Sequence, residues 1–186
     1  MQNFKDISYL RNGSDRQQAL YAFLMEYKLL KTLLDYDPVV VSTICVGLDT
    51  PASDVDIICC VPDISLFVAL LRSKFETMQK FTLEHGDERV VCRFCLNPFQ
   101  IEIFAQNIPV EQQAAYRHLQ VMLRLVKLGG EGFVEQIREL KLSGLKTEPA
   151  IAHALSLEGD PFKQVLGLEQ RGDAELLDLI EVAGMA

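Results

Sequence analysis

Two aspartates, Asp54 and Asp56, stand at the start of an apolar run that continues to Val61. Residues two apart in a β-strand point to the same face, with Cα atoms about 6–7 Å apart. In a strand, the two carboxylates would therefore project together, while Val55 and Ile57 face the other way. Two like charges side by side must be hydrated or paired, because burying them alone is costly. A divalent cation resolves this conflict, and Mg²⁺ commonly binds one or two carboxylates together with substrate phosphates.

A third carboxylate stands on a later segment that is also predicted to be a strand. Residues 99–106 alternate, with Ile101, Ile103 and Ala105 on one face and Glu102 on the other. If this segment pairs beside the strand of the two aspartates, Glu102 completes a three-carboxylate site. Such sites hold two metal ions roughly 4 Å apart, which bind the attacking and leaving oxygens of a nucleotidyl transfer. The alternative is that Glu102 is an outward-facing residue on a half-buried strand.

The segment 42–56 resembles the nucleotidyltransferases of the DNA polymerase beta superfamily, which have a Gly-Ser turn, a loop, an Asp-x-Asp motif entering a strand, and a later third acid. The matching residues stand in register without a gap: Thr43 at the serine position, then Gly47, Pro51, Ser53, Asp54 and Asp56. Ser42 replaces the usual first glycine, and Glu102 replaces the more usual aspartate. Most of the chain, including residues 148–149 and 157–161, resembles a bacterial nucleotidyltransferase-like family defined as domain of unknown function 4269.

This resemblance implies an α+β fold, in which a nucleotidyltransferase-like mixed β-sheet is flanked by helices and followed by a helical C-terminal half. It also implies two Mg²⁺ ions and a nucleoside triphosphate as substrate. The implied site consists of the catalytic and metal-binding acids Asp54, Asp56 and Glu102 and of the nucleotide-binding residues Ser42, Thr43, Gly47 and Ser53. From the residues themselves, Ser42 and Thr43 have an alternative role, which is to close a turn through side-chain-to-backbone hydrogen bonds.

The resulting hypothesis is a Mg²⁺-dependent nucleotidyltransferase that moves a nucleoside monophosphate from a nucleoside triphosphate to an unidentified acceptor. The alternative is a catalytically inactive nucleotidyltransferase-like domain that binds a nucleotide or a protein. The substitutions at Ser42 and Glu102 motivate that alternative.

Composition indicates a globular chain with an acidic balance. Of its 186 residues, 49% are hydrophobic and 24% are charged, which is typical of a folded domain. The net charge of −8 weighs against long nucleic acid as a partner, because binding to a polyphosphate backbone relies on clustered Lys and Arg, and it favours a small-molecule acceptor. Arg117 and Lys127 are candidates to bind a single triphosphate, and the alternative for them is a solvated helix face.

Several absences favour a cytoplasmic protein with no membrane partner. No apolar run reaches the eighteen or so residues of a membrane span, and the first residues lack the features of a signal peptide. The five cysteines form an odd set without a disulfide framework. Cys92 and Cys95 have C-x-x-C spacing, but on a strand they face opposite ways and cannot chelate one ion well. Nothing in these residues specifies the oligomeric state.

Turn signals and hydrophobic periodicity predict the order of the elements. A capping-box pattern at residues 14–17 starts a helix that is expected to end near Asp35. The other expected helices are 63–75, 109–128, 131–142, 148–157, 161–170 and 174–182, and the expected strands are 39–46, 54–61, 81–85, 90–96 and 99–106. Thr147 and Asp160 are expected N-caps. The expected organisation is an α+β core at 1–108 with a helical region at 109–186 packed on it, or one single domain 1–186.

Overall fold

The computed structural model describes residues 2–185, and its contacts divide them into two compact units. The sheet unit contains residues 3–42 and 53–113. The helical unit contains residues 114–185, residue 2 and the inserted segment 43–52. Each unit is described by itself below.

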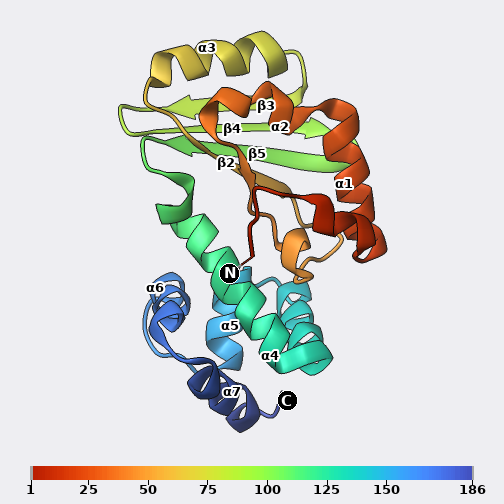
Figure 1. Cartoon of the computed structure of the whole chain (residues 1–186), viewed down its shortest axis with the longest axis vertical. Helices are drawn as coiled ribbons and strands as arrows, with labels where there is room; N and C mark the ends of the chain where they lie inside the picture. Colours follow the sequence, from red (N-terminus) through yellow and green to blue (C-terminus); the bar gives the residue numbers. More distant parts are fainter. Residues whose placement is uncertain (1, 186) are drawn as a thin grey trace. The chain divides into compact units, whose positions relative to one another are not determined.

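The sheet unit is built on a five-stranded mixed sheet with the strand order β1-β2-β5-β4-β3 (Figure 1). Its strands are β1 (Val39–Val40), β2 (Val55–Cys60), β3 (Gln79–His85), β4 (Arg89–Leu96) and β5 (Phe99–Gln106). The β2–β5 pair is parallel, whereas β1–β2, β3–β4 and β4–β5 are antiparallel. The α+β class and four of the five expected strands are therefore confirmed.

The expected strand 39–46 is wrong beyond its first two residues. Only Val39–Val40 pairs with β2, and Thr43–Val46 forms a short 3₁₀ helix, η3. The β-branched and apolar composition of this segment favours a strand. Here, however, its apolar side chains are buried within the helical unit, away from any sheet ladder. The apolar pattern of residues 43–46 reflects their burial, and both a strand and a 3₁₀ helix can bury these side chains.

The first expected helix is divided into three pieces, α1 (Asp15–Tyr27), α2 (Leu29–Thr32) and the 3₁₀ helix η2 (Leu34–Tyr36). The break occurs at Lys28, whose φ of 54° is left-handed and cannot continue an α-helix. The capping box at Ser14 is present, as expected. Helix α3 (Ile64–Phe75) also begins as expected, with the Asp63 side chain accepting from the backbone N–H of Leu66 at 3.0 Å.

Helices α1 and α3 cover the same face of the sheet. The ring of Phe23 in α1 contacts Phe99 of β5 at a centroid distance of 5.0 Å, and Phe75 in α3 stacks on Phe94 of β4 at 4.7 Å. The register that pairs Phe94 with Ile101 places these strand residues on one face. The other face of the sheet consequently carries the alternate residues, which include the acidic ones. The 3₁₀ helices η1 (Ser8–Asn12) and η4 (Val110–Gln112) complete this unit.

The helical unit contains four α-helices in its described residues. They are α4 (Ala114–Leu142), α5 (Thr147–Ala154), α6 (Pro161–Gly167) and α7 (Asp173–Val182), with the 3₁₀ helix η5 (Leu168–Gln170) after α6. The break expected between residues 128 and 131 is a kink inside α4, where Gly130 has a φ of 58°. Asp160 caps α6 as expected, but the N-cap of α5 is Lys146, and Thr147 is its first helical residue.

Candidate active site

The second aspartate and the third acid are direct neighbours in the sheet. Asp56 of β2 is the register partner of Glu102 in the parallel β2–β5 pair. Neighbouring strands lie about 4.8 Å apart, so these two side chains project side by side from one face. That face is opposite to the one covered by α1 and α3. Asp54 is exposed and lies immediately before β2 begins. The strand neighbourhood on which the three-carboxylate prediction depends is therefore present.

Two hydrogen bonds to main-chain carbonyl oxygens hold the start of β2 in place. The buried Ser42 hydroxyl donates to the Asp54 carbonyl oxygen at 2.7 Å, and the backbone N–H of Val41 donates to the Asp56 carbonyl oxygen at 2.8 Å. The first of these bonds runs from a side chain to the backbone, as considered for Ser42 above, but it joins residues 12 apart and does not close a local turn. A glycine at this position would lack the hydroxyl, so the serine has a structural reason to be here. Phosphate binding by Ser42 remains a prediction.

Arg16 of α1 holds the residue before Asp54. Its guanidinium donates to the Ser53 carbonyl oxygen at 3.0 Å and lies 5.5 Å from the centre of the Phe99 ring. Ser53 thus helps to position Asp54 through its backbone. The sequence analysis did not identify Arg16, because a long charged side chain in the first turn of a helix carries no signal of its distant partner.

A second residue that the sequence analysis did not identify is Arg93 of β4, which is the register partner of Glu102 in the antiparallel β4–β5 pair. Its Nε donates to Glu102 Oε2 at 2.6 Å, and its Nη1 contacts Glu84 Oε1 at 3.1 Å. Partial burial lowers the pKa of Arg93, but the hydrogen bond to Glu102 and the charges of Glu102 and Glu84 raise it more. The pKa of Arg93 consequently lies above its usual value.

The three acids have the ligand type that a divalent cation requires, and two of them are neighbours in the sheet. Glu102, however, also contacts Arg93. Carboxylate oxygens are the ligands that Mg²⁺ prefers, and Asp56 and Glu102 project side by side. However, Glu102 is turned to Arg93, and within residues 2–185 no three His, Cys, Asp or Glu side chains converge closely enough to hold a metal ion. Asp54 and Asp56 are the residues that would hold a cation beside Glu102. Ligation through Glu102 Oε2 requires that oxygen to leave Arg93.

The loop that precedes the two aspartates is tightly closed. The backbone N–H of Leu48 donates to the Thr43 carbonyl oxygen at 3.1 Å, and that of Gly47 donates to the Ile44 carbonyl oxygen at 3.2 Å. Gly47 has a φ of 75°, in the left-handed region that favours glycine. The glycine position shared with the nucleotidyltransferase pattern is thus one at which the backbone needs glycine.

Replacing Gly47 with alanine is expected to destabilise this loop by about 1–2 kcal/mol, because an L-residue is strained at positive φ. A Cβ at this position meets no atom within 4 Å, so the loss comes from backbone strain alone. The matched control is Gly86→Ala, since Gly86 also has open space and lies outside the positive-φ region. Urea unfolding of both variants checks the difference. Equal stability of the two variants would contradict the strain assignment.

Lys141 of α4 clamps the same loop. Its Nζ donates to the Leu48 carbonyl oxygen at 2.6 Å and to Thr43 Oγ1 at 3.3 Å. Three residues earlier, Arg138 forms an ion pair with the buried Asp49 at 3.7 Å. Lys141 and Arg138 thus contact the segment 43–49 from far along the chain, and the sequence analysis did not single out either of them.

We expect Lys141→Met to loosen the loop, because methionine keeps much of the stem of the side chain but cannot donate to either oxygen. Amide hydrogen exchange at Leu48, whose N–H closes the loop onto Thr43, is expected to accelerate by roughly three- to tenfold, as one charged hydrogen bond is worth about 1 kcal/mol or more. Lys141→Arg, which retains a donor, should give a smaller change. Exchange at Leu48 that equals the wild type in Lys141→Met would contradict the clamp.

The two predicted phosphate-binding cations, Arg117 and Lys127, lie in the first part of α4, before Arg138 and Lys141. Arg117 donates from Nε to Glu169 Oε2 and from Nη2 to Glu169 Oε1, and this pairing raises the pKa of Arg117 and lowers that of Glu169. Lys127 is exposed. Arg124, between them, binds Asp173 at 2.7 Å. A triphosphate role for Arg117 would compete with Glu169, and the roles of Arg117 and Lys127 remain predictions.

Three of the five cysteines, Cys45, Cys59 and Cys92, are buried. All five are free thiols. Cys92 and Cys95 lie in the regular part of β4, so their side chains point to opposite faces of the sheet, as expected. Burial raises the pKa of the Cys92 thiol to about 12 and also raises that of Cys59. Thiols that remain protonated at neutral pH are poor nucleophiles and poor metal ligands.

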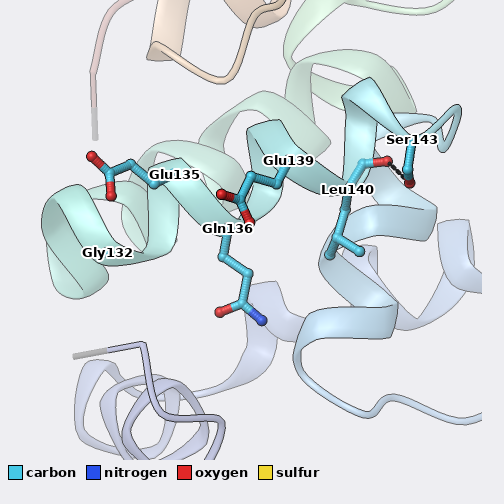
Figure 2. A pocket seen from close by; sticks show the side chains of 6 residues that line it. All are labelled: Gly132, Glu135, Gln136, Glu139, Leu140 and Ser143. Carbon is cyan, nitrogen blue, oxygen red and sulfur yellow. Dashed lines mark hydrogen bonds between the residues drawn. The ribbon is translucent and has the colours of Figure 1, made fainter.

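A surface hollow of about 430 Å³ lies on the second part of α4 (Figure 2). Its lining consists of Gly132, Glu135, Gln136, Glu139, Leu140 and Ser143. Figure 2 shows the two glutamates extending from the same stretch of helix, and Ser143 donating to the Leu140 carbonyl oxygen at 2.7 Å. Two carboxylates repel a triphosphate, so this hollow is unsuited to the nucleotide expected from the sequence.

Comparison with protein families decides the family of this chain. Residues 22–168 match the family described as a domain of unknown function, DUF4269. The chain belongs to this family. A comparison with curated proteins gives no significant match. In the described part of the chain, no helix is both long enough and apolar enough to cross a membrane.

Two solved structures are similar to this DUF4269 protein over most of its length. One is the structure of the GLD-2/RNP-8 complex, with 16% identity and a TM-score of 0.41, covering 92% of this chain and 80% of that one. The other is the polymerase core of TRAMP, described as an RNA surveillance complex, with 15% identity and a TM-score of 0.40. This match covers 91% of the DUF4269 chain and 59% of the polymerase chain.

Proposed function

We propose that this DUF4269 protein is a Mg²⁺-dependent nucleotidyltransferase, which transfers a nucleoside monophosphate from a nucleoside triphosphate to an acceptor. The observation that carries the proposal is the register pairing of Asp56 with Glu102 on the face of the sheet opposite α1 and α3. This pairing supports the three-carboxylate arrangement suggested by the Asp-x-Asp motif and its resemblance to the DNA polymerase beta superfamily. Asp54, two residues before Asp56, supplies the third acid.

Each acid has a distinct role in this proposal. Asp54 and Asp56 would hold the cations. Glu102 lies on the acceptor side and accepts the proton of the attacking group. When bound, Mg²⁺ lowers the pKa of the attacking group and neutralises charge on the leaving pyrophosphate. Ser42 and Arg16 support these roles indirectly, because they donate hydrogen bonds to the backbone carbonyls of Asp54 and Ser53.

The nucleotide-binding part of the proposal concerns the loop with Thr43 and Gly47. Thr43 and Gly47 match the nucleotidyltransferase pattern, in which this loop contacts the phosphates. Lys141 adds a positive charge to this loop through its bonds to Thr43 and Leu48. We therefore assign the terminal phosphates to this loop, with Lys141 as its support.

We propose a small molecule as the acceptor and the cytoplasm as the compartment. The net charge of −8 supports a small acceptor, because it disfavours the long polyanion of a nucleic acid. All five cysteines are free thiols, which supports a reducing compartment.

Pyrophosphate release tests the proposal. The full chain, incubated with Mg²⁺, each of the four ribonucleoside triphosphates and a panel of small hydroxyl, amine and phosphate acceptors, is expected to release pyrophosphate only when Mg²⁺ and an acceptor are present. Titration calorimetry with Mg²⁺ and the same triphosphates measures binding separately. Absence of both binding and release would overturn the proposal.

A specific observation favours a second candidate, which is an inactive domain that binds nucleotides. The Arg93–Glu102 ion pair neutralises the acid that is assigned to the acceptor side. If this pair persists when nucleotide binds, the site can hold a nucleotide with Asp54 and Asp56 but lacks the proton acceptor. Nucleotide binding without pyrophosphate release over the whole acceptor panel would support this candidate.

A further inference from the structure

Two acidic side chains and one arginine lie side by side on three neighbouring strands. Asp56 of β2 is paired in register with Glu102 of β5, and Glu102 is paired in register with Arg93 of β4. Regular pairing places all three side chains on the same face. Arg93 reaches Glu102 at 2.6 Å and, with another nitrogen of the same guanidinium, reaches Glu84 of β3 at 3.1 Å.

A guanidinium and a divalent cation compete for the same carboxylate at this place. The Glu102 oxygen that accepts from Arg93 Nε has part of its lone-pair capacity occupied. A cation that approaches Glu102 from the side of Asp56 also meets the positive charge of Arg93 at a distance where like charges repel. Arg93 therefore opposes ligation by Glu102, both by occupying the oxygen and by its charge.

We propose that Arg93 is a positioning residue that controls how tightly the acid site binds a divalent cation. It holds Glu102 in the absence of metal, and ligation through the same oxygen, Oε2, requires the release of that hydrogen bond. The second partner, Glu84, makes this release feasible, because the guanidinium already contacts that carboxylate and remains paired after the exchange. This inference rests on the proposed function, since the cation concerned is the one that the proposed reaction uses.

A titration of the full chain with Mn²⁺ tests the inference without any assay of activity. The electron paramagnetic resonance signal of free Mn²⁺ measures how much of the ion is bound. Arg93→Gln is expected to bind Mn²⁺ roughly two- to fivefold more tightly than the wild type, because a half-exposed ion pair contributes little more than this factor. Loss of folding cannot imitate a gain in affinity. Arg93→Lys keeps the charge but lacks the planar fork that spans two carboxylates, so an intermediate affinity is expected.

Arg89→Gln is the matched control. Arg89 lies on the same strand and, four residues away, on the same face as Arg93, but its register partner is Gln106. It removes the same charge at a distance of roughly 13 Å along the strand, beyond the screening length at physiological salt. Its Mn²⁺ affinity is therefore expected to equal that of the wild type, which separates the local ion pair from a general effect of net charge.

The outcomes distinguish this inference from the function on which it rests. Tighter binding in Arg93→Gln but not in Arg89→Gln supports it. Unchanged or weaker binding in Arg93→Gln, or an equal gain in Arg89→Gln, overturns the inference alone, provided that Asp56→Asn weakens Mn²⁺ binding. If neither Asp54→Asn nor Asp56→Asn alters Mn²⁺ binding, the proposed acid site itself is overturned, and the role of Arg93 is overturned with it.

Discussion

Asp56→Asn is expected to lower the rate of nucleotidyl transfer by at least about 10²–10³-fold, the cost typical of removing one group that stabilises charge in a transition state. Asparagine preserves the size of the side chain but offers a neutral oxygen, which holds Mg²⁺ less strongly than a carboxylate does. The main-chain bond from Val41 to the Asp56 carbonyl oxygen does not involve the side chain and should persist. The rate of pyrophosphate release at saturating Mg²⁺ measures the loss, and circular dichroism checks that the variant is folded.

The matched control for this prediction is Asp87→Asn. Asp87 is exposed in the turn between β3 and β4, in the same unit of the chain, and the substitution removes the same charge. Its rate is expected to equal that of the wild type. Full activity in Asp56→Asn, or an equal loss in Asp87→Asn, would contradict the assignment of Asp56 to the metal site.

The second large effect concerns the stability of the sheet unit. Leu71 in α3 is fully buried, with an exposed fraction of 0%. Leu71→Ala is expected to reduce the free energy of unfolding by about 2–5 kcal/mol, because it removes buried methyl groups and leaves a cavity that the surroundings fill incompletely. Urea unfolding at neutral pH, followed by circular dichroism, measures this loss.

Leu66→Ala is the control within the same helix. Leu66 has an exposed fraction of 64%, so the same substitution removes almost no buried surface and is expected to change the free energy of unfolding by at most about 0.5 kcal/mol. Both substitutions change helix propensity equally, because both sites lie in α3. The difference between the two variants thus isolates burial. Similar losses in both would show that α3 does not pack as described.

The sheet unit was predictable where local chemistry and packing agree. Alternation in residues 99–106 predicted β5, and the burial of Ile101, Ile103 and Ala105 against the exposure of Gln100 follows that alternation. Asp63 predicted the start of α3 because its side chain can accept from the first turn. In each case, one local signal and the tertiary environment favour the same structure.

The predictions were wrong where the same sequence pattern is compatible with two backbone conformations. Residues 43–46 are apolar and partly β-branched, which is compatible with a buried strand or with a buried 3₁₀ turn, and only packing within the helical unit selects the turn. Lys28 breaks the first helix although lysine is a good helix former, so the break has no local signal. Such positions are decided by contacts with residues that are distant in sequence.

The sequence by itself determined that three acidic side chains stand at the beginnings or outward positions of apolar strands, because side-chain direction alternates locally along a strand. Only the tertiary structure decided that β5 lies beside β2, so that Asp56 and Glu102 are neighbours, and that β4 brings Arg93 against Glu102. Strand order and ion-pair partners depend on which segments pack together, and no local periodicity encodes this choice.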